Sequence, residues 1–347
     1  MFSLPIARRT LPVVLIAGLA ACSGAQTTAG LVPSAPTASS HVAAAEVPAT
    51  QVPAAQVPAT SPLMFTANRD GKPYHEGGLL AFRMTADGNV KPEVNISGSN
   101  TTLYNPDSLA IDKADNIYAA DDGGTQVAVF ASSAHGNVAP ARVIGGSNSN
   151  LGPTEGLTIN AYGELLVSSY SNNDITEYEA HAKGNVTPIN TIGGSNTQLN
   201  SPAGMVIDPN GDLFVANTWG ASITVYAGNA KGNATPIRVI QGSFTALSAP
   251  FALALDQNGR LLVADENSGV LVFAKGANGN VAPLAQITSV SSADGVMADS
   301  NNNIYVADWG HKAIEEFASN ANGYATPIRS IKGSRTGFNG PNFLSLK

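Results

Sequence analysis

The chain has 347 residues, of which 43% are hydrophobic and 12% charged, so it can bury a large core and lacks the charge density of a disordered protein. Its net charge is −7, and no cluster of lysine and arginine interleaved with aromatic residues follows the N-terminal segment, which excludes a nucleic-acid-binding surface. The single cysteine excludes internal disulfide bonds and a thiol nucleophile in the folded part.

The N-terminal segment has the pattern of an export signal. Arg8 and Arg9 precede an apolar run over residues 11–21. This run is too short to cross a bilayer and is typical of the core of a signal peptide. We therefore expect residues 1–21 to be removed on export.

The apolar run ends at the only cysteine of the chain. The sequence Leu19-Ala-Ala-Cys22 resembles the lipobox of bacterial lipoproteins, which implies that Cys22 is acylated and becomes the new N-terminus. Ser23 stands where aspartate would favour the inner membrane, so the resemblance implies an outer-membrane location if the organism has one. The alternative is an ordinary cleaved signal peptide.

Residues 22–61 are predicted to be a tether. Alanine, proline and threonine dominate this segment, and Pro48, Pro53 and Pro58 recur at intervals of five residues. Proline at this spacing excludes both a helix and a central strand. The segment favours an extended conformation with a reach of about 100 Å, enough to hold a domain clear of a membrane.

From residue 62 to residue 347 one unit recurs. Its clearest copy is Asp208–Asn217, and equivalent decapeptides begin at Asp112, Asn160, Asp256 and Asp299, so successive starts lie 48, 48, 48 and 43 residues apart. A second marker, a glycine four residues before a proline, recurs six times, at Gly88, Gly136, Gly184, Gly232, Gly279 and Gly323. Repeats of about 45 residues indicate a modular fold.

Each unit is predicted to form four short antiparallel strands. In the fourth unit these are residues 205–208, 213–216, 222–226 and 235–240. A turn at Asp208-Pro-Asn-Gly211 joins the first two strands, and the Lys231-Gly-Asn233 segment is a hairpin signal between the last two. Four-stranded units repeated around an axis are typical of a β-propeller.

The two ends of the repeat region predict how the ring closes. The first unit lacks its innermost strand and begins at Leu63–Asn68, whereas Gly340–Lys347 matches only that strand. We expect an all-β, six-bladed β-propeller of four-stranded antiparallel blades, closed by pairing the C-terminal strand with the N-terminal blade. This pairing would leave no open sheet edge at the junction.

The repeat resembles the NHL-repeat family over residues 62–347. The resemblance lies in the pattern Pro-x-Gly-(apolar)-Asp-x-x-Gly-x-(Leu/Ile)-(Tyr/Phe)-Val-Ala-(Asp/Asn). A second run, Gly-Asn-Val-x-Pro-Ile-x-x-Ile-x-Gly, resembles that of bacterial secreted relatives. The family implies a six-bladed propeller, but such propellers serve as interaction modules, as lyases and, in related folds, as lactonases, so the resemblance implies no single activity.

A candidate cation site is predicted where the innermost strands begin. In a propeller, the loops that lead into these strands and the loops after the second strands share one face, which we name the loop face. Aligned on Asp112, the positions in the loops that enter the innermost strands are Asp107, Glu155, Ala203, Phe251, Asp294 and Asn342. Of these, Asp294, Asn342, Asp107 and Glu155 are contiguous in the ring and supply the oxygen atoms that a divalent cation such as calcium needs. The resemblance to lactonase-type propellers implies a metal here. The alternative is that these acids bond backbone amides or are solvated, and that no cofactor binds.

Other residues of the loop face allow further interpretations. Asp121, Asn217, Asp265 and Asp308 end the second strands, and their recurrence indicates loop capping. The lyases that the fold resembles use histidines at the mouth of the channel, whereas this chain places only His75 and His311 on the loop face. With Glu76, these two leave a two-histidine, one-carboxylate site as an alternative.

Aromatic residues indicate recognition. Tyr170, Trp219 and Trp309 lie on second-to-third-strand loops of three blades, where they suit binding of a protein, peptide or glycan, unless each ring packs on its own loop. Our leading hypothesis is a monomeric binding module, anchored to the membrane through Cys22. The alternative is a metal-dependent lactonase or lyase-like enzyme that uses the acidic residues around the mouth.

Overall fold

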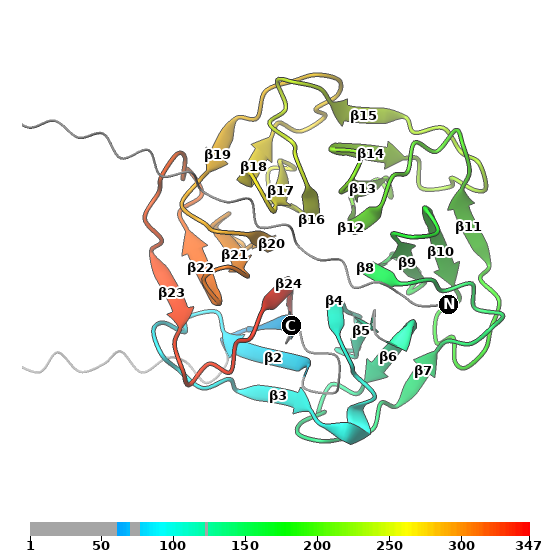
Figure 1. The fold of residues 1–347 in the computed structure, drawn as a ribbon, viewed down its shortest axis with the longest axis horizontal. Coiled ribbons are helices and arrows are strands. Elements are labelled where there is room, and N and C mark those ends of the chain that lie inside the picture. Colours follow the sequence, from blue (N-terminus) through cyan, green and yellow to red (C-terminus); the bar gives the residue numbers. More distant parts are fainter. Residues whose placement is uncertain (1–60, 70–76, 122–123) are drawn as a thin grey trace, which may run out of the picture. The chain divides into compact units, whose positions relative to one another are not determined.

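Each repeat folds as one four-stranded antiparallel sheet, and six such sheets surround a central axis (Figure 1). The computed structural model describes residues 61–69, 77–121 and 124–347. These residues contain twenty-four strands and one short 3-10 helix, η1 (Ser99–Thr101). The structure is therefore an all-β, six-bladed β-propeller, as predicted.

Every blade, from blade 1 to blade 6, contributes one strand to each of four concentric layers. The innermost strands are β24 (Pro341–Leu346), β4 (Pro106–Ile111), β8 (Thr154–Ile159), β12 (Pro202–Ile207), β16 (Pro250–Leu255) and β20 (Ala293–Ala298). The second strands are β1 (Leu63–Asn68), β5 (Ile117–Asp121), β9 (Leu165–Ser169), β13 (Leu213–Asn217), β17 (Leu261–Asp265) and β21 (Ile304–Asp308). The third strands are β2 (Gly78–Arg83), β6 (Gln126–Phe130), β10 (Asp174–Tyr178), β14 (Ser222–Tyr226), β18 (Gly269–Phe273) and β22 (Ala313–Phe317). The outermost strands are β3 (Val94–Ser97), β7 (Arg142–Ile144), β11 (Asn190–Gly193), β15 (Arg238–Gln241), β19 (Ala285–Ile287) and β23 (Arg329–Lys332).

The aspartate that begins the repeated decapeptide builds the turn between the first two strands. Asp208 Oδ1 accepts hydrogen bonds from the backbone N–H groups of Asn210, at 2.8 Å, and Asp212, at 2.9 Å. Gly211 has a φ of 90°, which favours glycine. The turn is therefore fixed by its own residues, which explains why this stretch recurs so regularly. We name the face that carries these turns the turn face.

The outermost strands are shorter than predicted. In blade 4 the expected strand covered residues 235–240, whereas β15 begins at Arg238. Pro236 has no N–H group, so the hydrogen bonds to the third strand begin at Ile237, whose N–H donates to Val225 at 2.8 Å.

The Gly-Asn pairs lie, as predicted, between the third and outermost strands, which pair as a hairpin, but they bond the neighbouring blade rather than form the tight turn. Gly184 of blade 3 donates its N–H to Val143 of blade 2, at 2.6 Å, and accepts the N–H of Gly145, at 3.2 Å. The side chain of Asn185 then accepts the backbone N–H of Asn148 of blade 2, at 2.6 Å. We name this arrangement the clasp. It links the outer edge of each blade to the loop that leaves the preceding blade.

Five of the six blade boundaries carry the complete clasp. The accepting side chains are Asn89, Asn137, Asn185, Asn233 and Asn280, which bond the backbone N–H groups of Arg335, Asn100, Asn148, Asn196 and Phe244. Blade 6 has Tyr324 at this position, with 86% of its surface exposed. The loop that it would hold belongs to the one unit that is 43 rather than 48 residues long, and this loop lacks the Gly-Ser-x-(Thr/Ser) turn of the others.

The ring closes as predicted, by pairing β24 with β1. The ladder is anchored at both ends, where Leu63 donates its N–H to Lys347 at 3.1 Å and Arg69 donates to Gly340 at 2.9 Å. The buried Thr66 hydroxyl donates to the carbonyl oxygen of Asn342 at 2.7 Å. The sheet edge of the first blade is thus covered by the last strand of the chain.

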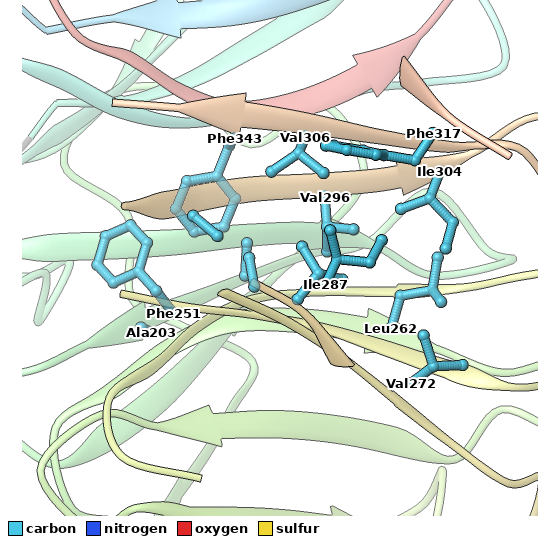
Figure 2. Close-up of a cluster of buried hydrophobic side chains, with 14 residues drawn as sticks. Ala203, Phe251, Leu262, Val272, Ile287, Val296, Ile304, Val306, Phe317 and Phe343 are labelled. Carbon is cyan, nitrogen blue, oxygen red and sulfur yellow. The ribbon is translucent and has the colours of Figure 1, made fainter. Parts of the chain in front are cut away.

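The hydrophobic core lies between the blades. Figure 2 shows one boundary, where Leu262 and Val272 of blade 5 pack with Val296 and Ile304 of blade 6. The cluster extends to the central axis through Phe343 of blade 1. Each blade thus supplies one apolar face to each neighbour, which is how a repeat that cannot bury its own core becomes stable in a ring.

The N-terminal predictions lie outside the described residues. These residues do not include 1–60, and so contain neither Cys22 nor most of the predicted tether. In the described part, no helix is long and apolar enough to span a membrane.

Candidate functional site

The residues that end the second strands hold the loops of the loop face. Asp265 Oδ2 accepts the backbone N–H groups of Ser248, at 2.8 Å, and Ala249, at 3.0 Å. Equivalent bonds to the loop before the innermost strand are made by Asn68, Asp121, Asn217 and Asp308. The predicted capping role is confirmed, and these bonds show that the two kinds of loop share one face.

Two acids of the predicted cation site are engaged by neighbouring side chains. Asp107, the second residue of β4, is fully buried, and its Oδ1 lies 2.7 Å from Nη1 of Arg69. Asp294, the second residue of β20, is also fully buried, and its Oδ1 accepts the hydroxyl hydrogen of Ser292 at 2.7 Å. The Arg69 guanidinium thus supplies a positive charge at one of the positions where a cation was expected.

The other two members of the predicted site differ in burial. Asn342, the second residue of β24, is fully buried, and neither atom of its amide finds a hydrogen-bond partner among the described residues. Glu155, the second residue of β8, is half-buried. Asn342 is therefore the member whose polar atoms most need a ligand.

The carboxylates of this predicted site do not form a tight group. In the described part of the chain, the one set of histidine, aspartate or glutamate ligand atoms lying within 4.8 Å of one another comes from Asp308, His311 and Glu315 in blade 6. Asp107, Glu155 and Asp294 are therefore not brought together at this spacing. A cation bound by these acids and Asn342 stays a prediction.

Two phenylalanines fill the axis beside these acids. The ring centroids of Phe251, from blade 5, and Phe343, from blade 1, lie 5.3 Å apart with the planes tilted by 53° (Figure 2). A side chain added at Gly204 of blade 4 would meet the Phe343 ring at 3.1 Å. Because blade 4 stands opposite blade 1 in the ring, the Phe343 side chain crosses the axis. The sequence placed Phe251 at the mouth but gave no sign of this pairing.

The three predicted binding aromatics differ in exposure. Trp219, on the loop between β13 and β14, exposes 71% of its surface, whereas Tyr170 and Trp309 are half-buried. Trp309 packs so closely under Gly340 that a side chain there would lie 2.1 Å from the indole Nε1. Sequence analysis missed Phe244, which exposes 69% of its surface on the loop after β15. Its only signal was an aromatic residue where the equivalent turns of the other loops have asparagine or arginine.

The structure tests only part of the histidine alternative. His311 lies on the loop between β21 and β22, and its Nδ1 is 2.8 Å from Asp308 Oδ2. His75 and Glu76 lie outside the described residues. Among the described residues, the side chain that contacts the His311 imidazole is therefore Asp308 and not a second histidine.

A cavity of about 1040 Å³ lies on the turn face of blades 3 to 5. Tyr162, Arg238 and Lys275 are among its lining residues, and the Arg238 guanidinium lies 5.0 Å from the centre of the Phe214 ring. None of the predicted site residues lines this cavity. The predicted site residues on the loop face and this cavity on the turn face are therefore separate features of the propeller.

Comparisons with known proteins support the fold alone. No protein-family model and no curated protein matches the sequence. Among solved structures, a protein of unknown function from Bacteroides caccae aligns with a TM-score of 0.59 and 13% identity, over 82% of this chain and 99% of that one. The nidogen/laminin complex aligns with a TM-score of 0.57 and 13% identity, over 82% and 98% of the chains. A candidate 6-phosphogluconolactonase from Bacteroides fragilis aligns with a TM-score of 0.55 and 14% identity, over 84% and 99%. At these identities the chain shares the β-propeller architecture of these proteins, and its function has to be argued from its own residues.

Proposed function

We propose that this protein is a binding module of the cell envelope, which uses the loop face of blade 4 to hold a protein, peptide or glycan. One observation carries the proposal: Trp219 and Phe244 expose 71% and 69% of their surfaces on neighbouring loops of one blade. Large exposed aromatic residues are enriched at recognition surfaces, because they bury much area and lose little conformational entropy on binding.

The loop that carries Trp219 is held in place by its neighbours. The Thr218 hydroxyl donates to the carbonyl oxygen of Pro250 at 2.9 Å, and the Thr218 N–H donates to Ser201 at 3.0 Å. The side chain of Gln241 donates to Gly220 at 3.0 Å, which ties this loop to the end of β15, three residues before Phe244. A partner would therefore meet a loop that is already ordered, which reduces the entropic cost of binding.

The proposed location rests on the sequence. The apolar run before Cys22 and the lipobox-like residues around it support export and acylation at this cysteine. Two or three acyl chains would hold the propeller at a membrane, the outer one if the organism has it, while the proline-rich segment gives it reach. The repeat pattern and this export signal together resemble secreted bacterial NHL proteins.

An enzyme is the second candidate, favoured by one observation. The amide of Asn342 is buried without a hydrogen-bond partner among the described residues, in the same ring of positions as Asp107 and Asp294. A divalent cation there would support a lactonase or lyase-like reaction. Against this candidate, Arg69 pairs with Asp107, and the Phe343 ring reaches across the axis toward Gly204 and contacts Phe251.

Binding is tested by tryptophan fluorescence. In a Trp309→Phe variant, Trp219 is the only tryptophan left, so titration with peptidoglycan fragments, polysaccharides and envelope proteins reports contact at the loop face directly. Phe244→Ala should weaken any binding at least tenfold, a typical cost for a central aromatic contact. Tyr162→Ala, which removes an aromatic ring that is 84% exposed on the turn face, is the matched control and should leave binding unchanged.

The outcomes separate the two candidates. Binding that Tyr162→Ala abolishes and Phe244→Ala spares would refute the loop-face proposal. Lactone hydrolysis that is lost in both Asp107→Ala and Asp294→Ala would establish the enzyme instead. Anchoring is tested by Cys22→Ser, which should move the protein into the soluble fraction, and a variant that still resists salt washing of the membranes would contradict acylation at this residue.

A further inference from the structure

Blade 6 contains a buried carboxylate that the other blades lack. Glu315, the third residue of β22, pairs with Val306 and exposes only 6% of its surface. Its charged neighbours are Asp308, His311 and Lys332. The equivalent residues of blades 1 to 5 are Leu80, Ala128, Thr176, Thr224 and Leu271. Burying a carboxylate in a blade is costly unless its charge is compensated, so this departure from the repeat singles out the surroundings of Glu315.

Glu315 shares its surroundings with Asp308 and His311. One ligand atom from each of the three residues lies within 4.8 Å of the others. The repeat shows why these side chains meet, because Asn217 and Thr224, at the positions of Asp308 and Glu315, are joined by a hydrogen bond of 3.0 Å in blade 4. The cluster is thus a consequence of placing three ligating side chains on an ordinary blade.

The charges of the cluster are unbalanced. Asp308 and Glu315 each place a carboxylate oxygen within 4.8 Å of the other, and His311 supplies the third ligand atom of this group. Two facing carboxylates in a blade interior are stable together only when a proton or a cation reduces their repulsion.

We propose that Asp308, His311 and Glu315 bind one divalent transition-metal ion, with zinc as the best fit. An imidazole nitrogen and two carboxylate oxygens are the donor set that zinc accepts, whereas calcium and magnesium favour oxygen ligands alone. The ion takes the place of the hydrogen between His311 Nδ1 and Asp308 Oδ2, which are 2.8 Å apart. His311 exposes 55% of its side chain, so water can complete the coordination from outside.

The surrounding hydrogen bonds already orient the aspartate. Asp308 Oδ1 accepts the backbone N–H groups of Ser292, at 3.2 Å, and His311, at 3.0 Å, and Oδ2 accepts that of Ser291, at 2.9 Å. Such bonds fix the direction of a ligating carboxylate before the ion arrives.

The position of the site indicates a structural role. Ser291 and Ser292 belong to the shortened loop between blades 5 and 6, the one boundary where Tyr324 replaces the asparagine of the clasp. The backbone part of the contact remains, with Gly323 donating to Gln286 at 2.7 Å. The ion joins the shortened loop, through Asp308, to β22, through Glu315. It therefore strengthens the boundary that lacks a complete clasp.

The test is metal binding by the purified, untagged protein after treatment with a chelator. Isothermal titration calorimetry with zinc should show one ion per chain, with manganese weaker. The melting temperature should rise by roughly 5 to 10 °C when free zinc is about 100 times the dissociation constant. Calcium and magnesium at the same concentration should leave the melting temperature unchanged.

Variants taken from blade 5 make the test specific. Glu315→Leu and His311→Ser introduce the residues that blade 5 has at these positions, Leu271 and Ser268, and both should lose the zinc-dependent rise. Without metal, Glu315→Leu should melt no lower than the parent, because it removes a buried carboxylate. Glu179→Gln changes the charge equally at an exposed position and should respond to zinc like the parent.

Two results would overturn the proposal: no zinc-dependent rise in the parent, or a rise that persists in both variants. If Glu315→Leu fails to fold, His311→Ser decides the question alone, since His311 is on the surface.

Discussion

Removing Gly340–Lys347 should destabilise the propeller far more than the length of this segment implies. The deletion takes away β24, and with it Phe343, which is 8% exposed and contacts Phe251 across the axis. It also leaves the buried Thr66 hydroxyl without the carbonyl group that it bonds at 2.7 Å. Blade 1 would then present the unpaired backbone of β1 to solvent.

The size of the effect can be estimated from these contacts. Burial of Phe343 contributes about 3 kcal/mol and its aromatic contact about 1 kcal/mol. Three backbone hydrogen bonds at the ends of the β1–β24 ladder contribute about 3 kcal/mol, and the hydrogen bond from the Thr66 hydroxyl to Asn342 contributes about 1 kcal/mol. The total of about 8 kcal/mol compares with about 5–15 kcal/mol for the free energy of unfolding of a typical domain. Leu346 adds little, because it is 43% exposed.

The assay is thermal unfolding, followed by circular dichroism. The truncated protein should melt at least 15 °C below the parent, at about 2 °C per kcal/mol for a domain of this size. Deleting Ala43–Thr50, also eight residues, removes only predicted tether and should leave the melting temperature unchanged. If the truncation is too unstable to purify, Phe343→Ala should show a loss of about 3–5 kcal/mol. A truncated protein that melts within about 2 °C of the parent would show that the β1–β24 pairing does not close the ring.

Asn185→Ala removes the clasp bond to Asn148, so the melting temperature should fall by about 2–4 °C. Tyr324→Asn should leave the melting temperature unchanged, because the loop after blade 5 lacks the turn that an asparagine there would hold. Equal effects of the two substitutions would contradict the clasp. Asp174→Asn tests a carboxyl group whose pKa is raised to about 6 by burial, against a weaker opposing bond from Asn150. The parent should lose stability relative to this variant as pH rises from about 4 to about 6, because the carboxyl group ionises at a lower pH in the unfolded chain than in the folded one. Above that range, denaturant unfolding should show the parent about 1 kcal/mol less stable than the variant, a figure that allows for screening of this partly exposed group by solvent. A gap that stays constant with pH would refute the assignment.

The sequence was sufficient for the architecture because the signals are local and repeated. Ser222–Tyr226 alternates with the period of a strand, and the structure gives β14 the same bounds. The Asp208-Pro-Asn-Gly211 turn depends on its own side chain and glycine, so it can be recognised without knowing the neighbouring blades. Closure could be predicted for a similar reason, since the missing and the extra strand are visible at the two ends of the repeat.

Features that depend on a neighbouring blade could not be read in this way. Gly184 and Asn185 form a favourable pair for a hairpin turn, and nothing near them shows that their partners are in the preceding repeat. The Phe343 ring crosses the axis, so its contact with Phe251 depends on the geometry of the closed ring. Glu315 could have been found from the sequence. Aligning the repeats shows a glutamate at a position where the other blades have leucine, alanine or threonine.

The clasp has a consequence for how such a ring can grow. Each of blades 1 to 4 contributes one Gly-Asn pair, which holds the unit before it, and one Gly-Ser-x-(Thr/Ser) turn, which is held by the unit after it, whereas blade 5 lacks the turn and blade 6 lacks the asparagine. A tandem duplication of any complete unit therefore brings both halves of a new joint, and the joints on either side still match. At the end of the chain the same rule closes the circle, since Asn89 of the first blade accepts the N–H of Arg335 after the last. One half has no partner without the other, and at the boundary before blade 6 both are absent, the Gly-Ser turn from the shortened loop and the asparagine at Tyr324. A designer who adds or removes blades should cut between complete units and leave the altered pair together.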